Sequence, residues 1–342
     1  MKFGSRISPV SHHPDHDSEV IDRTLKEIEL AETVGMDAVW LTEHHFIGEC
    51  AYADPLVFGA AIAARTSTLK IGFAVVQMAL HDPVRLATQT ALLDNLSHGR
   101  LIVGVGRGTA FNHYEYAGFG TTMEEGIKKL AEAEELLVKA WTSENLQFEG
   151  EYWKVSIPML RPRPFQKPHP TLARACLSEE SVTKMAKIGR PILIGGAGND
   201  VIGHRLELYR QEMARSGFDH AAVEKASSQS WVSKNLCIAD SYEEARNIAC
   251  SGYLQDMEHI RRARIMHNPP ATLDQAPTAA DAERFDNQFI LGTSSQVADQ
   301  IAELRDLGVR SLMLENSFGE MSFEQVSRTL TRFGENVIPL FT

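Results

Sequence analysis

Short apolar segments alternate with amphipathic helical patterns along almost the whole chain, and this alternation restricts the fold more than any other feature. A helical pattern at 18–34 ends at Gly35 and leads at once into the apolar segment 38–41. The same order of helix, glycine and strand returns at 301–314. In all, eight strand candidates are present, at 2–7, 38–41, 69–76, 100–106, 171–177, 191–196, 230–239 and the end of 301–314.

Helical patterns fill the intervals between these strands, at roughly 83–97, 123–142, 178–188, 200–216 and 241–252. Continuous apolar strands separated by helices are typical of a parallel sheet whose two faces are both covered. Eight such repeats predict an α/β fold of the closed (β/α)8 type, the TIM barrel.

Two segments interrupt the alternation. Residues 144–170 contain an alternating pattern followed by a Pro-rich stretch, which predicts a small hairpin and a strap. Residues 262–288 are polar and Pro-rich and precede the last helix–strand unit. A loop of that length in a compact domain is usually either functional or disordered, and we interpret this one as a lid. The prediction is one barrel domain, residues 1–342, with insertions at about 144–170 and 262–288.

The charge and the cysteines exclude several classes of protein. A net charge of -11 argues against nucleic acid or an anionic membrane surface as the main partner. No signal peptide is visible, and no segment approaches the roughly 20 apolar residues that span a bilayer. The four cysteines lack the spacing of a zinc site or a disulfide framework: Cys50, Cys176, Cys237 and Cys250. We therefore expect a reduced, cytoplasmic protein.

Ionisable side chains follow the second strand candidate in the sequence WLTEHHF, residues 40–46. Glu43, His44 and His45 leave this strand at its C-terminal end. Active-site groups of parallel barrels lie at that end of the strands, so this polar cluster is expected to face a ligand. The alternative is one buried, hydrogen-bonded histidine and one surface histidine.

Two further strand ends carry groups that suit an anion. Arg107 lies in the glycine-rich sequence GVGRG after the fourth strand, where the backbone can approach a ligand and a guanidinium can bind phosphate. The spacing does not match a Rossmann fingerprint. Ser178 and Ser181 span the first turn of the helix after the fifth strand, which predicts either an anion site or a simple helix cap.

Taken together, these motifs resemble the bacterial luciferase-like, flavin-dependent monooxygenases. The resemblance rests on separated segments that occur in the family's order over nearly the whole chain: WLTEHHF (40–46), HDPVRLATQTALLDNLSHGR (81–100), VGVGRG (103–108), PRPFQKPHP (162–170), the serine-bearing turn and the closing helix–glycine–strand unit. It implies a TIM barrel that binds reduced FMN at its C-terminal mouth and is commonly a homodimer.

The resemblance also implies roles for single residues. His44 is similar to the family's active-site histidine beside the flavin ring, and we expect it to act as a base. Arg107 is similar to the ligand of the FMN phosphate, with Leu177, Ser178 and Ser181 completing that site. Ala74 and Val75 stand where relatives have a non-prolyl cis peptide packed under the ring, and 262–288 matches the family's lid.

Two positions depart from the luciferases. Gly106 stands where they have a cysteine, and Gly196 stands where they have a tryptophan. Both changes remove side chains near the expected cavity. The hypothesis is therefore a roomier pocket for a substrate bulkier than a long-chain aldehyde.

The resemblance implies that a separate NAD(P)H-dependent reductase supplies reduced FMN, which reacts with O2 to a flavin hydroperoxide that oxygenates a small organic substrate. Two alternatives belong to the same superfamily: a deazaflavin-dependent enzyme that transfers hydride, and a non-catalytic flavin-binding protein. A third alternative, a metal-dependent hydrolase, would use His12, His13 and His44, although the sequence HHPDH lacks the spacing of metal ligands.

Overall fold

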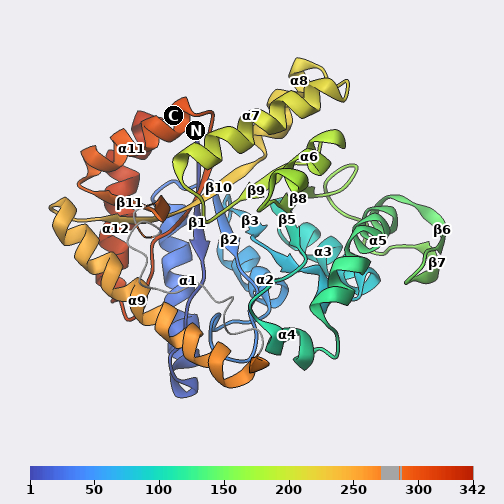
Figure 1. Ribbon diagram of the computed structural model, residues 1–342, viewed down its shortest axis with the longest axis horizontal. Coiled ribbons are helices and arrows are strands. Elements are labelled where there is room, and N and C mark those ends of the chain that lie inside the picture. Colours follow the sequence, from blue (N-terminus) through green and yellow to red (C-terminus); the bar gives the residue numbers. More distant parts are fainter. Residues whose placement is uncertain (271–284, 286, 342) are drawn as a thin grey trace.

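The computed structural model describes residues 1–270, 285 and 287–341 (Figure 1). Eight parallel strands close into the predicted TIM barrel. In barrel order they are β1 (Lys2–Ile7), β2 (Ala38–Leu41), β3 (Lys70–Phe73), β5 (Leu101–Gly106), β8 (Thr171–Ala175), β9 (Ile192–Ile194), β10 (Trp231–Ile238) and β12 (Ser311–Glu315). The ring closes where Trp231 of β10 pairs with Leu193 of β9, and where β12 pairs with β1.

Two short strands extend the barrel wall. β4 (Val76–Gln77) continues the third strand candidate after a break and pairs with the end of β5. β11 (Phe289–Gly292) pairs with the second half of β10. Asn235 of β10 pairs with Glu315 of β12 on one side and with Phe289 of β11 on the other. β11 therefore pairs with the same edge of β10 as β9, which pairs with the start of β10 at Trp231 and Val232.

Helices surround the barrel (Figure 1). They are α1 (Asp17–Thr33), α2 (Pro55–Arg65), α3 (Pro83–Leu96), α4 (His113–Gly118), α5 (Met123–Thr142), α6 (Glu179–Lys187), α7 (Asn199–Arg215), α8 (His220–Ser228), α9 (Tyr242–His267), α11 (Ser294–Asp306) and α12 (Phe323–Asn336). The starts of α2 and α3 follow from their sequences. Asp54 and Asp82 each precede a proline and accept hydrogen bonds from backbone N–H groups of the first turn.

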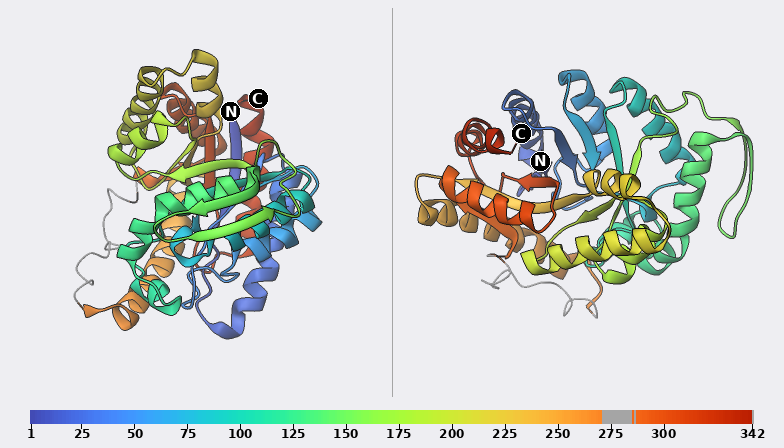
Figure 2. Two further views of the ribbon diagram at one scale, coloured as in Figure 1. Left: turned by 90° about the vertical axis from the view of Figure 1, so that its right-hand side faces the viewer. Right: turned by 90° about the horizontal axis from the view of Figure 1, so that it is seen from above.

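The two predicted insertions have different outcomes. The hairpin is present as the antiparallel pair β6 (Glu144–Glu149) and β7 (Lys154–Met159), which projects from the side of the barrel (Figure 2). In the segment predicted as a lid, residues 262–267 form the last turns of α9, which is much longer than the predicted helix 241–252. Residues 271–284 and 286 of that segment lie outside the described residues, so the lid itself stays a prediction.

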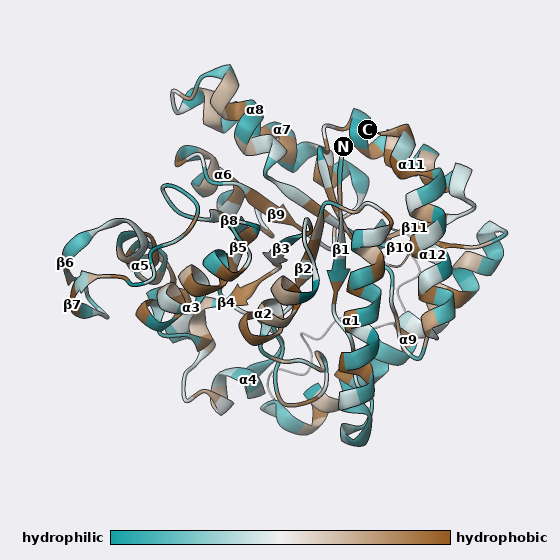
Figure 3. Cartoon of the chain, turned by 180° about the vertical axis from the view of Figure 1, so that it is seen from behind, coloured by the Kyte–Doolittle hydropathy of each residue, from teal (hydrophilic) through white to brown (hydrophobic). Residues whose placement is uncertain are grey.

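The buried apolar residues form two layers. Figure 3 colours hydrophobic residues brown along the strands and helices. The larger layer lies between the strands and the helices. The smaller one fills the barrel interior with Trp40, Trp231 and small or branched neighbours, and the two indole rings lie 5.0 Å apart. Gly72 makes room for this packing, since a Cβ there would lie 2.5 Å from the Trp40 ring. This apolar plug is the floor on which the mouth of the barrel is built.

Among the helices that the structure describes, none combines the length and the apolar composition that a bilayer crossing requires. All four cysteines are free thiols.

Candidate functional site

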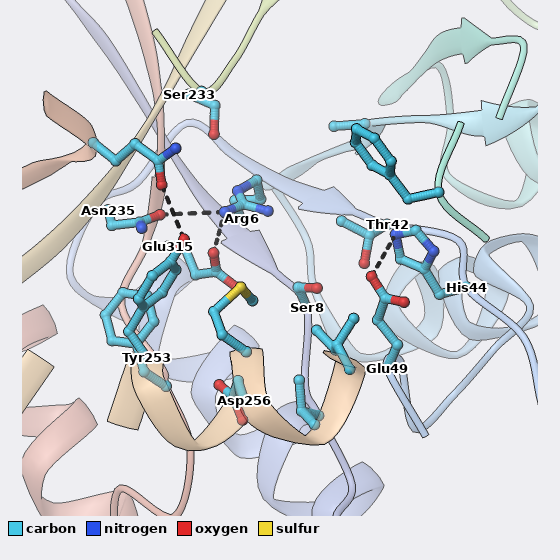
Figure 4. Close-up of a pocket in the computed structure, with 18 of the residues that line it drawn as sticks. Arg6, Ser8, Thr42, His44, Glu49, Ser233, Asn235, Tyr253, Asp256 and Glu315 are labelled. Atoms are coloured by element: carbon cyan, nitrogen blue, oxygen red, sulfur yellow. Dashed lines mark hydrogen bonds and ion pairs between the residues drawn. The ribbon is translucent and has the colours of Figure 1, made fainter. Parts of the chain in front are cut away.

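A cavity of about 320 Å³ lies at the C-terminal mouth of the barrel (Figure 4). Side chains from the ends of β1, β2, β10 and β12 line its base, and α9 forms one wall. The lining includes Arg6, Thr42, His44, Glu49, Ala74, Gly196, Lys234, Asn235, Tyr253, Asp256, Met257, Ile260, Arg261, Arg264, Glu315 and Phe318.

His44 faces this cavity because of the alternation along β2. Ala38 and Trp40 point into the barrel, whereas Val39 and Leu41 pack against the helices. Thr42 and His44 follow Trp40 by two and four residues. They therefore lie on the same inner side of the barrel, above the apolar plug. The alternation of inward and outward side chains along β2 thus supports the prediction that His44 faces a ligand.

Two carboxylates hold the His44 ring. Its Nδ1 lies 3.2 Å from Oε1 of Glu115, and its Nε2 lies 3.6 Å from Oε1 of Glu49. Burial alone would lower the pKa of His44, but the charges of Glu49 and Glu115 outweigh it and raise that pKa to about 9. The two carboxylates therefore favour the protonated form of His44. A protonated ring donates a proton, so this arrangement supports an acid, and the role of His44 as a base stays a prediction.

Glu43 and His45 do not face a ligand, which corrects the prediction of a polar cluster at the mouth. Glu43 is buried on the outer side of β2, where it accepts hydrogen bonds from Nε2 of His81 (2.8 Å), Nε2 of His45 (3.0 Å) and the Gln77 backbone N–H (2.6 Å). Although burial opposes its charge, these donors lower the pKa of Glu43 to about 2. Its function is to hold the strand ends around His44.

Further residues fix the carboxylates beside His44, and sequence patterns did not indicate them. The Asn112 side chain donates to Oε2 of Glu49 (2.8 Å) and accepts from Nε of Arg264 (2.8 Å). Arg264 belongs to α9, so this helix reaches across the mouth to the loop after β5, beside α4 (Figure 1). The sequence does not indicate the role of Arg264, because this residue falls in the segment 262–288 that is predicted to be a lid.

The peptide bond between Ala74 and Val75 is cis, as the family resemblance implied. Ala74 lines the cavity. Val75 turns toward the next strand, where a Cβ built on Gly106 would lie only 2.8 Å from Cγ2 of Val75. The space that a larger residue at position 106 would need is therefore already filled by Val75.

Arg107, Leu177, Ser178 and Ser181 lie at the same end of the barrel as His44, outside the cavity itself. The register of β5 and β8, with Val105 opposite Arg174, brings the two following loops next to each other. The two serines form a capping box at the start of α6. Within the described residues, no hydrogen bond joins Arg107 to either serine. Their role as an anion site stays a prediction, and the cap is present.

A second charged group at the cavity base was not predicted. Arg6 points inward from β1, donates from Nη2 to Oδ1 of Asn235 (3.2 Å) and forms an ion pair with Glu315. Burial raises the pKa of Glu315 to about 7, although Arg6 opposes this. Residues 6 and 315 lie at opposite ends of the chain, so no local pattern could have joined them.

The histidines of the metal-dependent alternative do not come together. His12 pairs with Asp256 (2.9 Å), His13 lies on the surface at the start of a short 3-10 turn, and His44 is held by carboxylates as described. In the part of the chain that the structure describes, no group of three or more His, Cys, Asp or Glu side chains could hold a metal ion.

A comparison of the sequence with known families agrees with the barrel fold. The family model described as luciferase-like monooxygenase matches residues 1–311. The chain belongs to this family. Its fold and its family therefore agree with the resemblance inferred from the motifs.

Relatives within the luciferase-like monooxygenase family differ in their coenzyme. The structure of the monooxygenase RslO1 from Streptomyces bottropensis superimposes with a TM-score of 0.85 at 26% identity and covers 100% of both chains. The oxygenase component of a flavin-dependent trigonelline monooxygenase from Acinetobacter baylyi is 23% identical over 95% of this chain and 91% of that protein. An F420-dependent glucose-6-phosphate dehydrogenase from Amycolatopsis mediterranei is 27% identical over 90% and 91%. The protein is thus an oxidoreductase, and its coenzyme is a separate question.

For this luciferase-like protein, only one of the two glycine departures enlarges the cavity. Gly196 lines it, and a Cβ there would have no neighbour closer than Nε2 of Gln288 at 3.8 Å. At Gly106 the Val75 side chain takes up the space instead. The hypothesis of a roomier pocket is supported at position 196 and contradicted at position 106.

Proposed function

We propose that this protein is a monooxygenase that binds reduced FMN and uses O2 to oxygenate a small organic substrate. One observation carries the proposal: His44 and the cis peptide of Ala74 and Val75 meet at the barrel mouth, at the same end as the exposed guanidinium of Arg107. The trigonelline relative, which is flavin-dependent, supports the choice of cofactor.

The residues present fit a flavin at this end of the barrel. The buried hydroxyl of Tyr116 has no hydrogen-bond partner among the described residues, and it lies beside Gly108 in the loop that contains Arg107. An unsatisfied buried donor next to a guanidinium suits an anionic group. We infer that Arg107, Leu177, Ser178 and Ser181 hold the FMN phosphate, and that Ala74 and Val75 support the ring.

The bound flavin would supply the electrons that activate O2 for transfer of one oxygen atom to the substrate. The protein's own contribution is an acid at a fixed place. Glu115 accepts from Nδ1 of His44, which leaves Nε2, next to Glu49 at the cavity wall, as the donor toward the cavity. His44 therefore acts as a proton or hydrogen-bond donor, and Glu49 and Glu115 keep it protonated.

Anaerobic titration with reduced FMN, followed by a pulse of O2, tests this function. We expect saturable binding of reduced FMN and O2 consumption that rises when an oxidisable substrate is present. The F420-dependent relative makes a deazaflavin enzyme the second candidate. Hydride transfer from reduced deazaflavin without O2 consumption would favour that candidate and contradict our proposal.

Two partners belong to the proposal. Reduced FMN would come from a separate NAD(P)H:flavin reductase, so adding such a reductase with NADH should replace chemically reduced FMN in the assay.

A homodimer is supported by large apolar side chains that are exposed on the adjacent helices α2 and α3, namely Val57, Leu92 and Leu96. Light scattering after size-exclusion chromatography would show a dimer, and a monomer at all concentrations would contradict it. The cytoplasmic location stays a prediction.

A further inference from the structure

Arg6 is a guanidinium inside the barrel with spare donors. Its Nη2 contacts Asn235 and Glu315, whereas Nη1 has no hydrogen-bond partner among the residues that the structure describes. The side chain keeps 22% of its surface exposed, at the base of the cavity. Figure 4 shows this group apart from the His44–Glu49 pair. Arg6 therefore keeps hydrogen-bond donors that could bind a ligand, although it lies inside the barrel.

The cavity carries more positive than negative side chains, in contrast to the acidic chain as a whole. Five basic residues and three acidic residues line it among the described positions: Arg6, His44, Lys234, Arg261 and Arg264 against Glu49, Asp256 and Glu315. The whole chain has a net charge of -11. His44 and Arg261 are also paired with carboxylates outside the lining, Glu115 and Glu258. The feature that suits an anion is therefore the spare donor of Arg6 and not a net positive charge of the cavity.

The wall that α9 forms is partly apolar, although Asp256, Arg261 and Arg264 also belong to it. Tyr253, Met257 and Ile260 lie one turn apart along α9, and Phe318 from the loop after β12 lies beside them. Aromatic and thioether side chains of this kind bind flat, apolar bodies. A molecule that satisfies both surfaces has a flat apolar body and one negatively charged oxygen at its end.

We propose that Arg6 binds the ionised oxygen of a flat, aromatic acid or phenol, which is the substrate class of this cavity, and that Glu315 competes with that oxygen for the guanidinium. The proposal rests on the monooxygenase function above and specifies its substrate. Arg6 is then the specificity-determining residue of the site, whereas His44 and the flavin would be shared by enzymes that act on other substrates.

Binding of 2-naphthoate and of its neutral counterpart 2-naphthamide, measured by calorimetry with FMN present, tests the anchor. We expect Arg6→Gln to weaken naphthoate binding by about tenfold or more, as for a lost charged hydrogen bond, and to leave naphthamide unchanged. Glu315→Gln removes the competing carboxylate and should tighten naphthoate binding by about threefold or more. The two variants therefore shift naphthoate affinity in opposite directions.

Arg261→Gln is the matched control. Arg261 also lines the cavity, but Glu258 binds its guanidinium through two hydrogen bonds of 2.7 and 2.9 Å. We expect this variant to change naphthoate affinity by less than about twofold, since an exposed ion pair contributes little. Circular dichroism checks that each variant folds. If Arg6→Gln does not fold, Glu315→Gln alone decides, because it keeps the guanidinium.

Flavin fluorescence in the same samples distinguishes a failure of the Arg6 proposal from a failure of the proposed monooxygenase function. A protein that binds FMN but shows no saturable naphthoate binding overturns the anchor and leaves the monooxygenase function standing. The anchor is also overturned by equal losses for naphthoate and naphthamide in Arg6→Gln, or by weaker naphthoate binding in Glu315→Gln. A protein that binds no reduced FMN contradicts the proposed function first.

Discussion

The protonation of His44 depends on two carboxylates, and replacing Glu49 by glutamine is expected to lower the pKa of His44. The rise from an ordinary value of about 6.5 to about 9 corresponds to roughly 3 kcal/mol of preference for the imidazolium. Burial opposes the rise, the charge of Glu49 is its largest single favourable cause, and Glu115 adds both a hydrogen bond and its own charge. In Glu49→Gln we therefore expect the pKa of His44 to fall by at least about 1, while the glutamine keeps a hydrogen-bonding group beside Asn112.

NMR titration of the His44 ring, without flavin, measures this directly, and the spectrum of His44→Gln assigns the signal. Because the pKa is raised in the folded protein, the stabilisation is fully present below about pH 6.5 and is lost as the pH rises through about 9. The difference in unfolding free energy between the wild type and His44→Gln should therefore shrink over that pH range. A wild-type His44 that titrates near 6.5, or an unchanged titration in Glu49→Gln, would refute the reasoning.

Three further changes have expected outcomes. His44→Ala should retain FMN binding and lower turnover by about 10²–10⁴-fold, as for a lost acid–base group, and unchanged turnover would remove His44 from the mechanism. Arg107→Ala should weaken FMN binding by about tenfold or more in a fluorescence titration, and undiminished affinity would place the phosphate elsewhere. Gly72→Ala should destabilise the fold by about 1–3 kcal/mol in urea, because its Cβ would lie 2.5 Å from Trp40. The control Gly195→Ala, whose Cβ would meet nothing nearer than 3.6 Å, should stay within about 0.5 kcal/mol.

The barrel was predictable because its signal is repeated: each β–α unit shows the same order of apolar strand, polar loop and amphipathic helix. Helices without that regular pattern were missed. α2 begins only after the loop of residues 42–54, and α8 and α12 follow another helix or a loop where we expected no helix. The end of α9 was missed because the prolines after Asn268 made the whole region resemble a loop.

The site was only partly predictable, because it depends on which face of a strand each residue occupies. Position 44 was correctly placed at the mouth, yet the same argument placed Glu43 there too. The period of two along β2 separates them: Trp40 points inward, so His44 does as well and Glu43 does not. Glu315 pairs with Arg6, and Arg264 pairs with Glu49. The partners in each pair are more than two hundred residues apart in the sequence, and the closed barrel brings them together.

The two faces of β2 are nevertheless joined, and the connection explains why ionisable residues occur in succession there. The Gln77 backbone N–H donates to Glu43, and its side-chain Nε2 donates both to the Glu43 carbonyl (2.7 Å) and to Oε2 of Glu115 (3.1 Å). Glu115 in turn orients His44. The buried carboxylate of Glu43 thus positions the same glutamine that fixes the partner of His44. Because a buried charge that loses one partner is strongly destabilising, the network around Glu43 is a rigid support for His44.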